Sequence, residues 1–96
     1  MIKYKVKYSS EFKKNLKKLV KQRKNINKLF DVIDVLSVGG TLGYKYKDHA
    51  LNNDKRFNEC RDCHIEPDWI LIYKYYNDEL ILLLVNTGSH SNLFNL

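Results

Sequence analysis

Hydrophobic and polar residues alternate at the beginning of the chain. Over residues 2–8, aromatic or aliphatic side chains occupy the even positions and lysines occupy the odd ones. A period of two predicts a β-strand with one buried face. The pattern changes at Ser9-Ser10-Glu11, where two hydroxyls and a carboxylate are typical of a helix N-terminus.

The period then becomes helical. Hydrophobic residues recur at helical spacing from Phe12 to Val20, with lysines on the opposite face, and again from Ile26 to Leu36. Asn25 precedes the second stretch, and Gly39-Gly40 predicts its end. Because only a few residues join the two helices, we expect an antiparallel helical hairpin whose apolar side packs on a sheet.

The second half of the chain is predicted to be a loop followed by three strands. Residues 41–55 have no sustained period and predict a long loop, which is usually functional or mobile in a compact domain. Residues 56–65, 69–76 and 80–85 favour strands, joined by turns at Glu66-Pro67-Asp68 and Asn77-Asp78. The last of these strands is apolar throughout, which is typical of burial on both faces, and a short polar tail ending in Leu93-Phe94 follows it.

The predicted order is therefore β-α-α-β-β-β, in one α+β domain over residues 1–96. One mixed sheet with a two-helix hairpin on one face satisfies the rule that layers bury their apolar sides together. The 96 residues contain no apolar run long enough to span a membrane, and the first residues lack the apolar core of a signal peptide. We expect a cytoplasmic protein.

The chain is basic, with a net charge of +6 from 17 Lys and Arg against 11 Asp and Glu. Such an excess favours partners rich in phosphate or carboxylate, although it is also compatible with a soluble basic protein that has no such partner. Residues 80–96 contain no Lys or Arg, so the charge is unevenly distributed.

Cys60 and Cys63 form a Cys-x-x-Cys pair. A structural zinc site normally needs four ligands, and the chain has no second Cys pair. A redox pair would need a helix after the first Cys, whereas this stretch favours a strand. We therefore expect two reduced thiols, at least one of them packed inside, with no disulfide, no metal and no cofactor.

All three histidines lie outside the predicted helices. His49 lies in the long loop, His64 at the end of a strand, and His90 after the last strand. Strand ends and adjoining loops can meet along one rim of a sheet, and imidazoles accept or donate protons near neutral pH. Individually, each is equally compatible with an ordinary surface histidine. Asp68 could orient an imidazole, act as a base or cap its turn.

Aromatic residues near these positions favour two different roles. Trp69 could stack on a nucleobase or fill the core. Tyr44 and Tyr46 alternate with Lys45 and Lys47, a pattern that suits a single-stranded nucleic acid. Acid–base cleavage of an RNA phosphate without a metal is chemically possible with these residues.

Three stretches resemble the YafQ family of the RelE toxin superfamily. They are residues 46–51 (YKDH-x-L), 59–73 (ECRDCHIEPDWILIY) and 87–94 (TGSHS-x-LF). The stretches come in the family's order and cover the domain, and the resemblance implies the family's microbial-RNase fold. It also implies a toxin of a type II toxin–antitoxin system that cuts mRNA in the ribosomal A site, contacts 16S rRNA, and is neutralised by a DinJ/RelB-like antitoxin.

The resemblance places the family's catalytic residues on His49, His64, Asp68 and His90. It implies His90 as general acid, Asp68 or His64 as general base, and His49 as a phosphate or proton-transfer partner. Trp69 and Phe94 would position the base or the ribose.

Position 86 departs from the family, which usually has arginine four residues before the last histidine, where this chain has Asn86. Losing that cation could cost about 2–4 kcal/mol of transition-state stabilisation. Either nearby cations compensate or the change attenuates the enzyme; the candidate cations are Lys45, Lys47, Lys55, Arg56 and Arg61. The alternatives to a full enzyme are a non-catalytic RNA- or ribosome-binding protein, and a homologue that acts mainly in antitoxin binding and operon autoregulation.

Overall fold

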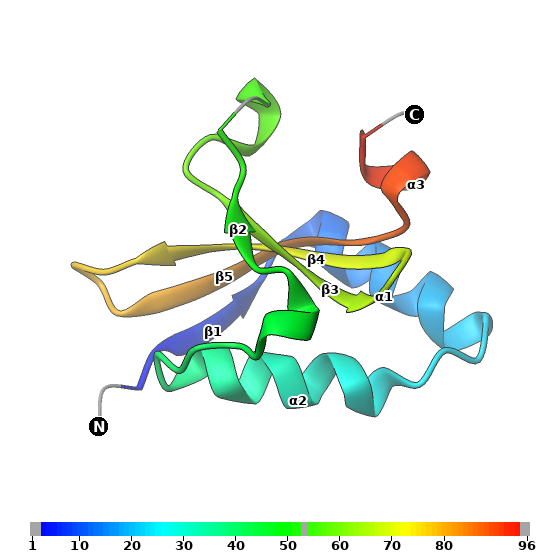
Figure 1. Cartoon of the computed structure of the whole chain (residues 1–96), viewed down its shortest axis with the longest axis horizontal. Coiled ribbons are helices and arrows are strands. Elements are labelled where there is room, and N and C mark those ends of the chain that lie inside the picture. The colour runs from blue at the N-terminus through cyan, green and yellow to red at the C-terminus, as the bar shows by residue number, and fades with distance from the viewer. Residues whose placement is uncertain (1–2, 53, 95–96) are drawn as a thin grey trace.

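A five-stranded sheet in the order β1-β5-β4-β3-β2 forms the centre of the computed structural model, which describes residues 3–52 and 54–94 (Figure 1). β1 pairs in parallel with β5, and the other neighbours are antiparallel, so the sheet is mixed. The elements in chain order are β1 (Lys5–Tyr8), α1 (Ser10–Lys21), α2 (Ile26–Ser37), the 3-10 turn η1 (Tyr44–Tyr46), β2 (His49–Ala50), the 3-10 turn η2 (Lys55–Phe57), β3 (Arg61–Glu66), β4 (Trp69–Tyr76), β5 (Ile81–Gly88) and α3 (His90–Phe94).

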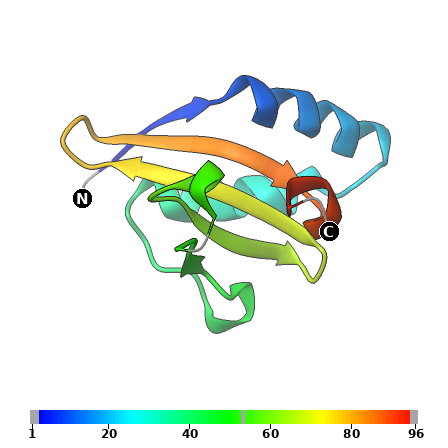
Figure 2. The ribbon, with the colours of Figure 1, turned by 90° about the horizontal axis from the view of Figure 1, so that it is seen from above.

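The two long helices begin and end where their capping residues predict. Ser9 Oγ accepts a hydrogen bond of 3.0 Å from the Phe12 backbone N–H at the start of α1, and Asn25 caps α2 in the same way. Gly39, with φ of 71°, lets the chain turn back after α2. Seen from above, α1 runs along the β1 edge of the sheet, and α2 lies behind the strands (Figure 2).

Two hydrophobic cores lie on the two faces of the sheet. The larger core joins α1 and α2 to β3, β4 and β5, and includes Phe12, Leu36 and Leu71. The smaller core, on the opposite face, contains Phe57 and Leu93 and holds η2 and α3 against the strands. The second core matters for function because it fixes the two segments that border this open face of the sheet.

The α+β fold with a two-helix hairpin on one face is confirmed, and four local predictions need correction. The loop over residues 41–55 contains η1, β2 and the start of η2, and the polar tail folds into α3. The strand predicted over residues 56–65 begins only at Arg61, because η2 and a turn occupy the residues before it. β5 continues to Gly88 and excludes Leu80, whose φ is 52°. Residue 2 of the first predicted strand lies outside the described residues.

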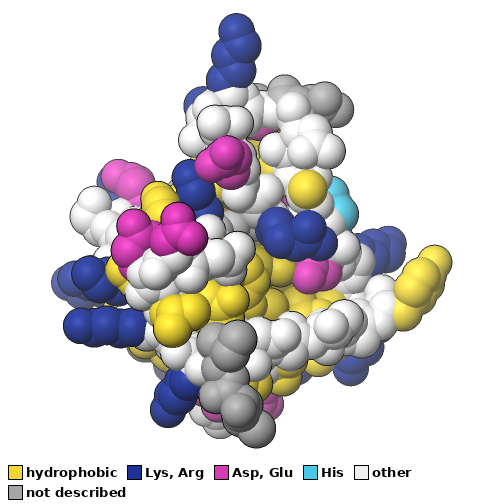
Figure 3. All heavy atoms as spheres, turned by 90° about the vertical axis from the view of Figure 1, so that its left-hand side faces the viewer, with side chains coloured by type: hydrophobic (Ala, Val, Ile, Leu, Met, Phe, Trp, Pro, Cys, Tyr) yellow, Lys and Arg dark blue, Asp and Glu magenta, His cyan; other side chains and the backbone are white. Residues whose placement is uncertain are grey.

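The surface and the thiols are consistent with a folded domain whose apolar residues are mostly internal. Cys60 and Cys63 are both free and buried, which confirms that the thiols pack inside; they belong to opposite cores, so they point away from each other. Around the tip of the β4–β5 hairpin, hydrophobic surface lies between Lys and Arg side chains (Figure 3). No helix within the described ranges has the length and apolar character needed to cross a membrane.

Candidate active site

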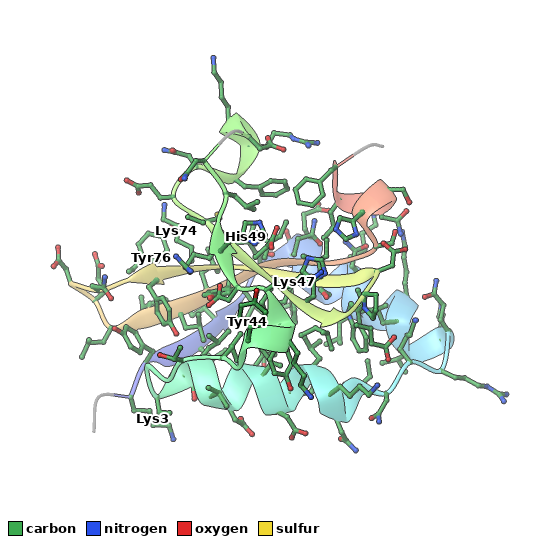
Figure 4. All side chains as sticks on the ribbon, viewed as in Figure 1. Lys3, Tyr44, Lys47, His49, Lys74 and Tyr76 are labelled. Carbon is green, nitrogen blue, oxygen red and sulfur yellow. The ribbon has the colours of Figure 1, made fainter. Side chains whose placement is uncertain are left out.

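Two histidines and one aspartate lie on or beside β3, on the sheet face opposite α1 and α2. Side chains alternate along β3, so Cys63 and Ile65 enter the main core while Asp62 and His64 take the other face. β2 brings His49 directly opposite Asp62 in the strand register. His49 lies above the sheet with Lys47 on the same segment (Figure 4).

His90 is held by Asp68. The imidazole Nδ1 lies 2.9 Å from Asp68 Oδ1, and the same oxygen accepts a hydrogen bond of 3.1 Å from the His90 backbone N–H. These hydrogen bonds from His90 lower the pKa of Asp68. Asp68 is therefore a carboxylate that fixes the orientation of His90 and offers a counter-charge to its imidazolium.

His64 lies next to His90, with ring centroids 5.2 Å apart. Its Nδ1 is 3.3 Å from the carbonyl oxygen of Pro67, in the turn between β3 and β4. The turn between β3 and β4 thus holds both histidines. His64 contacts the backbone of Pro67, and the next residue, Asp68, binds His90.

His49 is the third imidazole of the site. Its Nδ1 lies 2.7 Å from the Lys47 carbonyl oxygen and 3.3 Å from Asp62 Oδ1. Lys47 adopts a left-handed conformation with φ of 50°, which turns its carbonyl toward the ring that follows two residues later.

The contacts of the three rings define which nitrogen can react. Carbonyl and carboxylate oxygens only accept hydrogen bonds, so Nδ1 of each ring carries the hydrogen. In the neutral form, Nε2 of His49, His64 and His90 is then the basic nitrogen, and in the charged form it is the acid. The site presents three imidazoles with the same tautomer to a substrate.

Asp62 is the functional candidate that sequence reasoning missed. It is only 4% exposed, and its Oδ1 has no hydrogen-bond partner among the described residues, because the nearest imidazole N–H is directed to Lys47. Burial raises the pKa of Asp62, and the positive charge of nearby His49, His64 and His90 opposes that rise. Strand alternation with His64 was the signal that could have identified it.

Phe94 borders the site beside His90, as expected. Its ring centroid lies 6.3 Å from the His90 ring and 5.7 Å from Phe57, against which it packs edge-on. Leu93 lies 4% exposed in the smaller core and anchors α3. This arrangement leaves a half-buried aromatic ring next to the imidazoles, where it could contact a base or a ribose.

The prediction that Trp69 stacks on a nucleobase is wrong. Trp69 is only 1% exposed in the main core, and its Nε1 donates a hydrogen bond of 3.0 Å to Thr87 Oγ1. A ring enclosed on both faces cannot stack on a nucleobase, so Trp69 supports the start of β4 and the Asp68 turn from beneath.

The expected role of Arg61 in substrate binding stays a prediction, although its side chain is already paired. Arg61 is one residue before Asp62 on β3, and its side chain therefore takes the opposite face of the strand. Its guanidinium binds Asp48 at 3.2 Å, and Asp48 also accepts a hydrogen bond of 2.7 Å from the Tyr73 hydroxyl. Arg61 thus fixes the segment before His49, and both residues line a hollow of about 560 Å³.

Lys45 and Lys47 line a hollow of about 310 Å³ that also contacts His64. Lys28 reaches the same hollow from α2 and binds Glu66 at 3.0 Å. We call this space the lysine hollow. Its cations are close to the histidines, whereas Arg56 is paired with Asp54 at 2.8 Å in η2.

Asn86 lies on β5 with its amide turned toward α1. Its Oδ1 accepts hydrogen bonds from Asn15 Nδ2 at 2.5 Å and from the Thr87 backbone N–H at 2.9 Å. The side chain is therefore engaged, and it provides no cation where the resembled family usually has one.

Comparison with known proteins places this geometry in a family. Residues 4–95 match the family described as the bacterial YafQ toxin of type II toxin–antitoxin systems. The chain is 40% identical to the mRNA interferase toxin YafQ of Escherichia coli BL21-DE3, over 98% of this chain and 99% of the relative. The chain belongs to the YafQ toxin family.

Solved structures of YafQ-type toxins share the fold. The crystal structure of the E. coli DinJ–YafQ toxin–antitoxin complex matches with a TM-score of 0.85 and 37% identity, covering 97% of this chain and 99% of that one. A metal-bound toxin from Helicobacter pylori matches with a TM-score of 0.88 and 38% identity, covering 95% and 99%.

The Helicobacter pylori relative is metal-bound, so the side chains of this site are compared with the requirements of a metal ion. Asp62, His49, His64 and His90 offer ligand types that transition metals accept. Within residues 3–52 and 54–94, however, no three such side chains converge closely enough to hold a metal ion as they stand. In this structure the Nδ1 atom of each histidine lies against a carbonyl or carboxylate oxygen.

Proposed function

We propose that this chain is an mRNA interferase that cuts ribosome-bound mRNA in the A site by general acid–base catalysis. The observation that carries the proposal is the pair formed by His90 and Asp68 beside His64, on an open sheet face. Cleavage of this kind needs a base for the 2′-hydroxyl, an acid for the leaving 5′-oxygen and cations for the phosphate. Each of these requirements has a candidate within the described site.

His90 is the general acid of the proposed reaction. Asp68 fixes its Nδ1–H, so that the proton on Nε2 of the charged ring is the one available to the leaving oxygen. Replacing the carboxylate would leave the ring free to rotate and to change tautomer.

His64 is the favoured general base, with His49 as the second candidate. The hydrogen bonds that lower the pKa of Asp68 make that carboxylate a weaker base and commit it to His90. His64 lies beside the acid with Nε2 unblocked by its Pro67 contact. Asp62 lies buried beside His49, with its Oδ1 3.3 Å from the His49 Nδ1.

The phosphate would be held from the lysine hollow. Lys45 and Lys47 line the same hollow as His64 and offer positive charge there. They are the cations that best compensate for Asn86, since Arg61 and Arg56 are committed to aspartates.

A cognate antitoxin and the ribosome are the proposed partners. The E. coli relative forms a complex with DinJ, and the basic surface of this chain suits an acidic partner of the DinJ/RelB type. The same surface suits 16S rRNA, with contacts that weaken as salt rises.

The test compares naked and ribosome-bound message. Purified protein should cut mRNA on programmed ribosomes and leave the same mRNA intact in solution, and cutting should persist in EDTA. Salt-sensitive binding without a cleavage product, retained after all three histidines are replaced, would instead establish a non-catalytic ribosome-binding protein. Loss of cutting in EDTA that returns with an added transition metal would replace the metal-free mechanism.

Asn86 allows a second candidate function, an attenuated toxin that acts mainly through its antitoxin. Asn86→Arg tests it, because arginine adds a permanent charge and a planar fork at the family's usual position. Attenuation predicts a gain in cleavage on the order of 10²-fold, from a phosphate contact worth about 2–4 kcal/mol. An unchanged rate would show that Lys45 and Lys47 already supply the charge.

A further inference from the structure

A second hollow lies on the other side of the β3–β4 turn, between α1 and the start of α3. It has a volume of about 240 Å³, and Asp68 and Ser89 are among the residues that line it. We call it the α1–α3 hollow. Because Asp68 binds His90 and Ser89 precedes it, the hollow is adjacent to the general acid of the proposed reaction.

The composition of the α1–α3 hollow favours an uncharged ligand. Its two lysines, Lys18 and Lys24, are matched by the carboxylates of Glu66 and Asp68, and Lys24 already binds Glu66 at 3.3 Å. A phosphate placed there would face both carboxylates. Besides two hydroxyl groups, the remaining polar side chains are carboxamides, which offer paired donors and acceptors to planar ligands. They belong to Asn15, Gln22 and Asn92.

The floor and the size of the hollow suit a planar ring. Leu19 and the edge of Trp69 contribute apolar surface beneath the carboxamides. Pockets that enclose a drug-sized ligand have volumes of about 300–1,000 Å³. A space of about 240 Å³ therefore suits a single heterocycle better than a whole nucleotide.

Asn15 is fixed in one orientation by Asn86. The Thr87 backbone N–H can only donate, so the Asn86 atom that it contacts at 2.9 Å must be the amide oxygen. That same oxygen lies 2.5 Å from Asn15, which must therefore direct its NH₂ group toward Asn86. The Asn15 oxygen is left as a fixed hydrogen-bond acceptor in the wall of the hollow.

We propose that the α1–α3 hollow receives the nucleobase next to the cleaved phosphodiester, and that Asn15, held by Asn86, selects that base. The inference rests on the proposed RNA-cleaving function and names a specificity-determining residue for it. It also gives Asn86 a role of its own, because an arginine at that position could not accept the Asn15 N–H.

Binding of uncleavable RNA tests the inference. The probes are fully 2′-O-methylated hexamers of A, C or U, and the readouts are their Kd values and the ¹⁵N-edited side-chain amide signal of Asn15. The wild-type chain should discriminate between the best and worst hexamer by about tenfold, a preference expected of one directional hydrogen-bond pair. The Asn15 amide signal should shift most with the preferred hexamer.

The variants separate selection from folding. Asn15→Ala should bring the three Kd values to within about twofold of one another, and the isosteric Asn15→Asp, which cannot donate to Asn86, should change the preference as well. Asn27→Ala, the same change at an exposed position of α2, should retain the wild-type preference. Thermal unfolding of each variant shows that it folds.

Equal Kd values for the wild-type chain, or an Asn15 signal that no hexamer shifts, would overturn the inference while leaving the cleavage assay of the proposed function to stand. Selection through Asn15 in a chain that cuts no ribosome-bound mRNA would support the inference and overturn the proposed function.

Discussion

At the scale of single residues, the chemistry of the site is determined by what each imidazole Nδ1 contacts. His49, His64 and His90 each direct Nδ1 to an oxygen of the protein, at 2.7, 3.3 and 2.9 Å respectively. The reactive nitrogen is therefore the same in all three rings, although the rings come from a short strand, a longer strand and a helix. The Nδ1 contacts with protein oxygens therefore give the three histidines a common orientation of their reactive nitrogen.

The buried carboxylate of Asp62 predicts a pH-dependent cost in stability. Its raised pKa means that the folded state holds the proton more tightly than the unfolded state. The folded state is then progressively destabilised as pH rises above the unfolded value of about 3.9. Asp62→Asn should increase the free energy of unfolding at pH 7 by about 1 kcal/mol, the lower end for a buried unpartnered polar group.

Urea unfolding of Asp62→Asn and wild type at several pH values checks this. The difference in unfolding free energy should shrink toward zero below about pH 4, where the aspartate is protonated in both states. Asp34→Asn, on the exposed side of α2, is the matched control. If Asp62→Asn were less stable than wild type at pH 7, the conclusion that the buried charged carboxylate of Asp62 destabilises the fold would be wrong.

The residue types of the site could be predicted from the sequence, but the face that each residue occupies could not. His49, His64, Asp68 and His90 were expected to meet on one rim, and the structure brings His64, Asp68 and His90 into contact, while His49 contacts the intervening Asp62. Trp69 and Arg61 were expected there too, because a family motif does not record strand register. A shift of one position along β3 separates Arg61 from Asp62, and only pairing with β4 determines which of them enters the site.

At the scale of elements, α3 is the piece that completes the site. It is five residues long, too short to be stable alone, and depends on Leu93 and Phe94 packing in the smaller core. Phe57, from η2, contacts Phe94 edge-on across the site. Two short segments on the same face of the sheet therefore stabilise each other.

Phe57→Leu should loosen α3 more than it unfolds the domain. Leucine preserves most of the buried apolar volume, so the loss of stability should stay below about 1.5 kcal/mol, while the aromatic contact with Phe94 disappears. We expect faster amide hydrogen exchange in α3 and a severalfold slower cleavage rate.

The matched control for that change is Phe30→Leu, which alters packing against the main core instead. It should cost similar stability without affecting exchange in α3. Unchanged exchange in α3 of Phe57→Leu would show that α3 is held independently of η2.

Most elements followed from sequence periodicity, and the exceptions share a physical cause. β4 and both long helices were predicted close to their observed bounds, because each buries one continuous stripe or face. β2 and α3 were missed because they are two and five residues long and owe their conformation to distant partners, β3 for the one and the smaller core for the other. No local period exists in segments of that length.

At the scale of the whole molecule, the helices and the chemistry take opposite faces of one sheet. The helical hairpin packs on the main core, whereas only η2 and α3 pack on the smaller core of the opposite face, where the histidines lie. The net charge of +6 attracts acidic partners over distances comparable with the Debye length.

A cognate antitoxin should therefore cover the open face and the rim around it. We expect a segment with acidic and apolar residues over residues 43–55 and around Phe94. Hydrogen exchange of the complex, formed with a DinJ-type antitoxin, should show protection there and little change on the outer face of α1. Protection confined to α1 would move the interface to the opposite side.

The most direct test of the central claim is primer extension on a translated message with wild-type protein and His90→Ala. The account predicts wild-type cuts at codons positioned in the A site, and a loss of at least about 10²-fold in His90→Ala, at the lower end of the contribution of general acid–base catalysis. Lys14→Ala, an exposed change on α1, should cut as the wild type does. Equal cutting by wild type and His90→Ala would contradict the proposed active site.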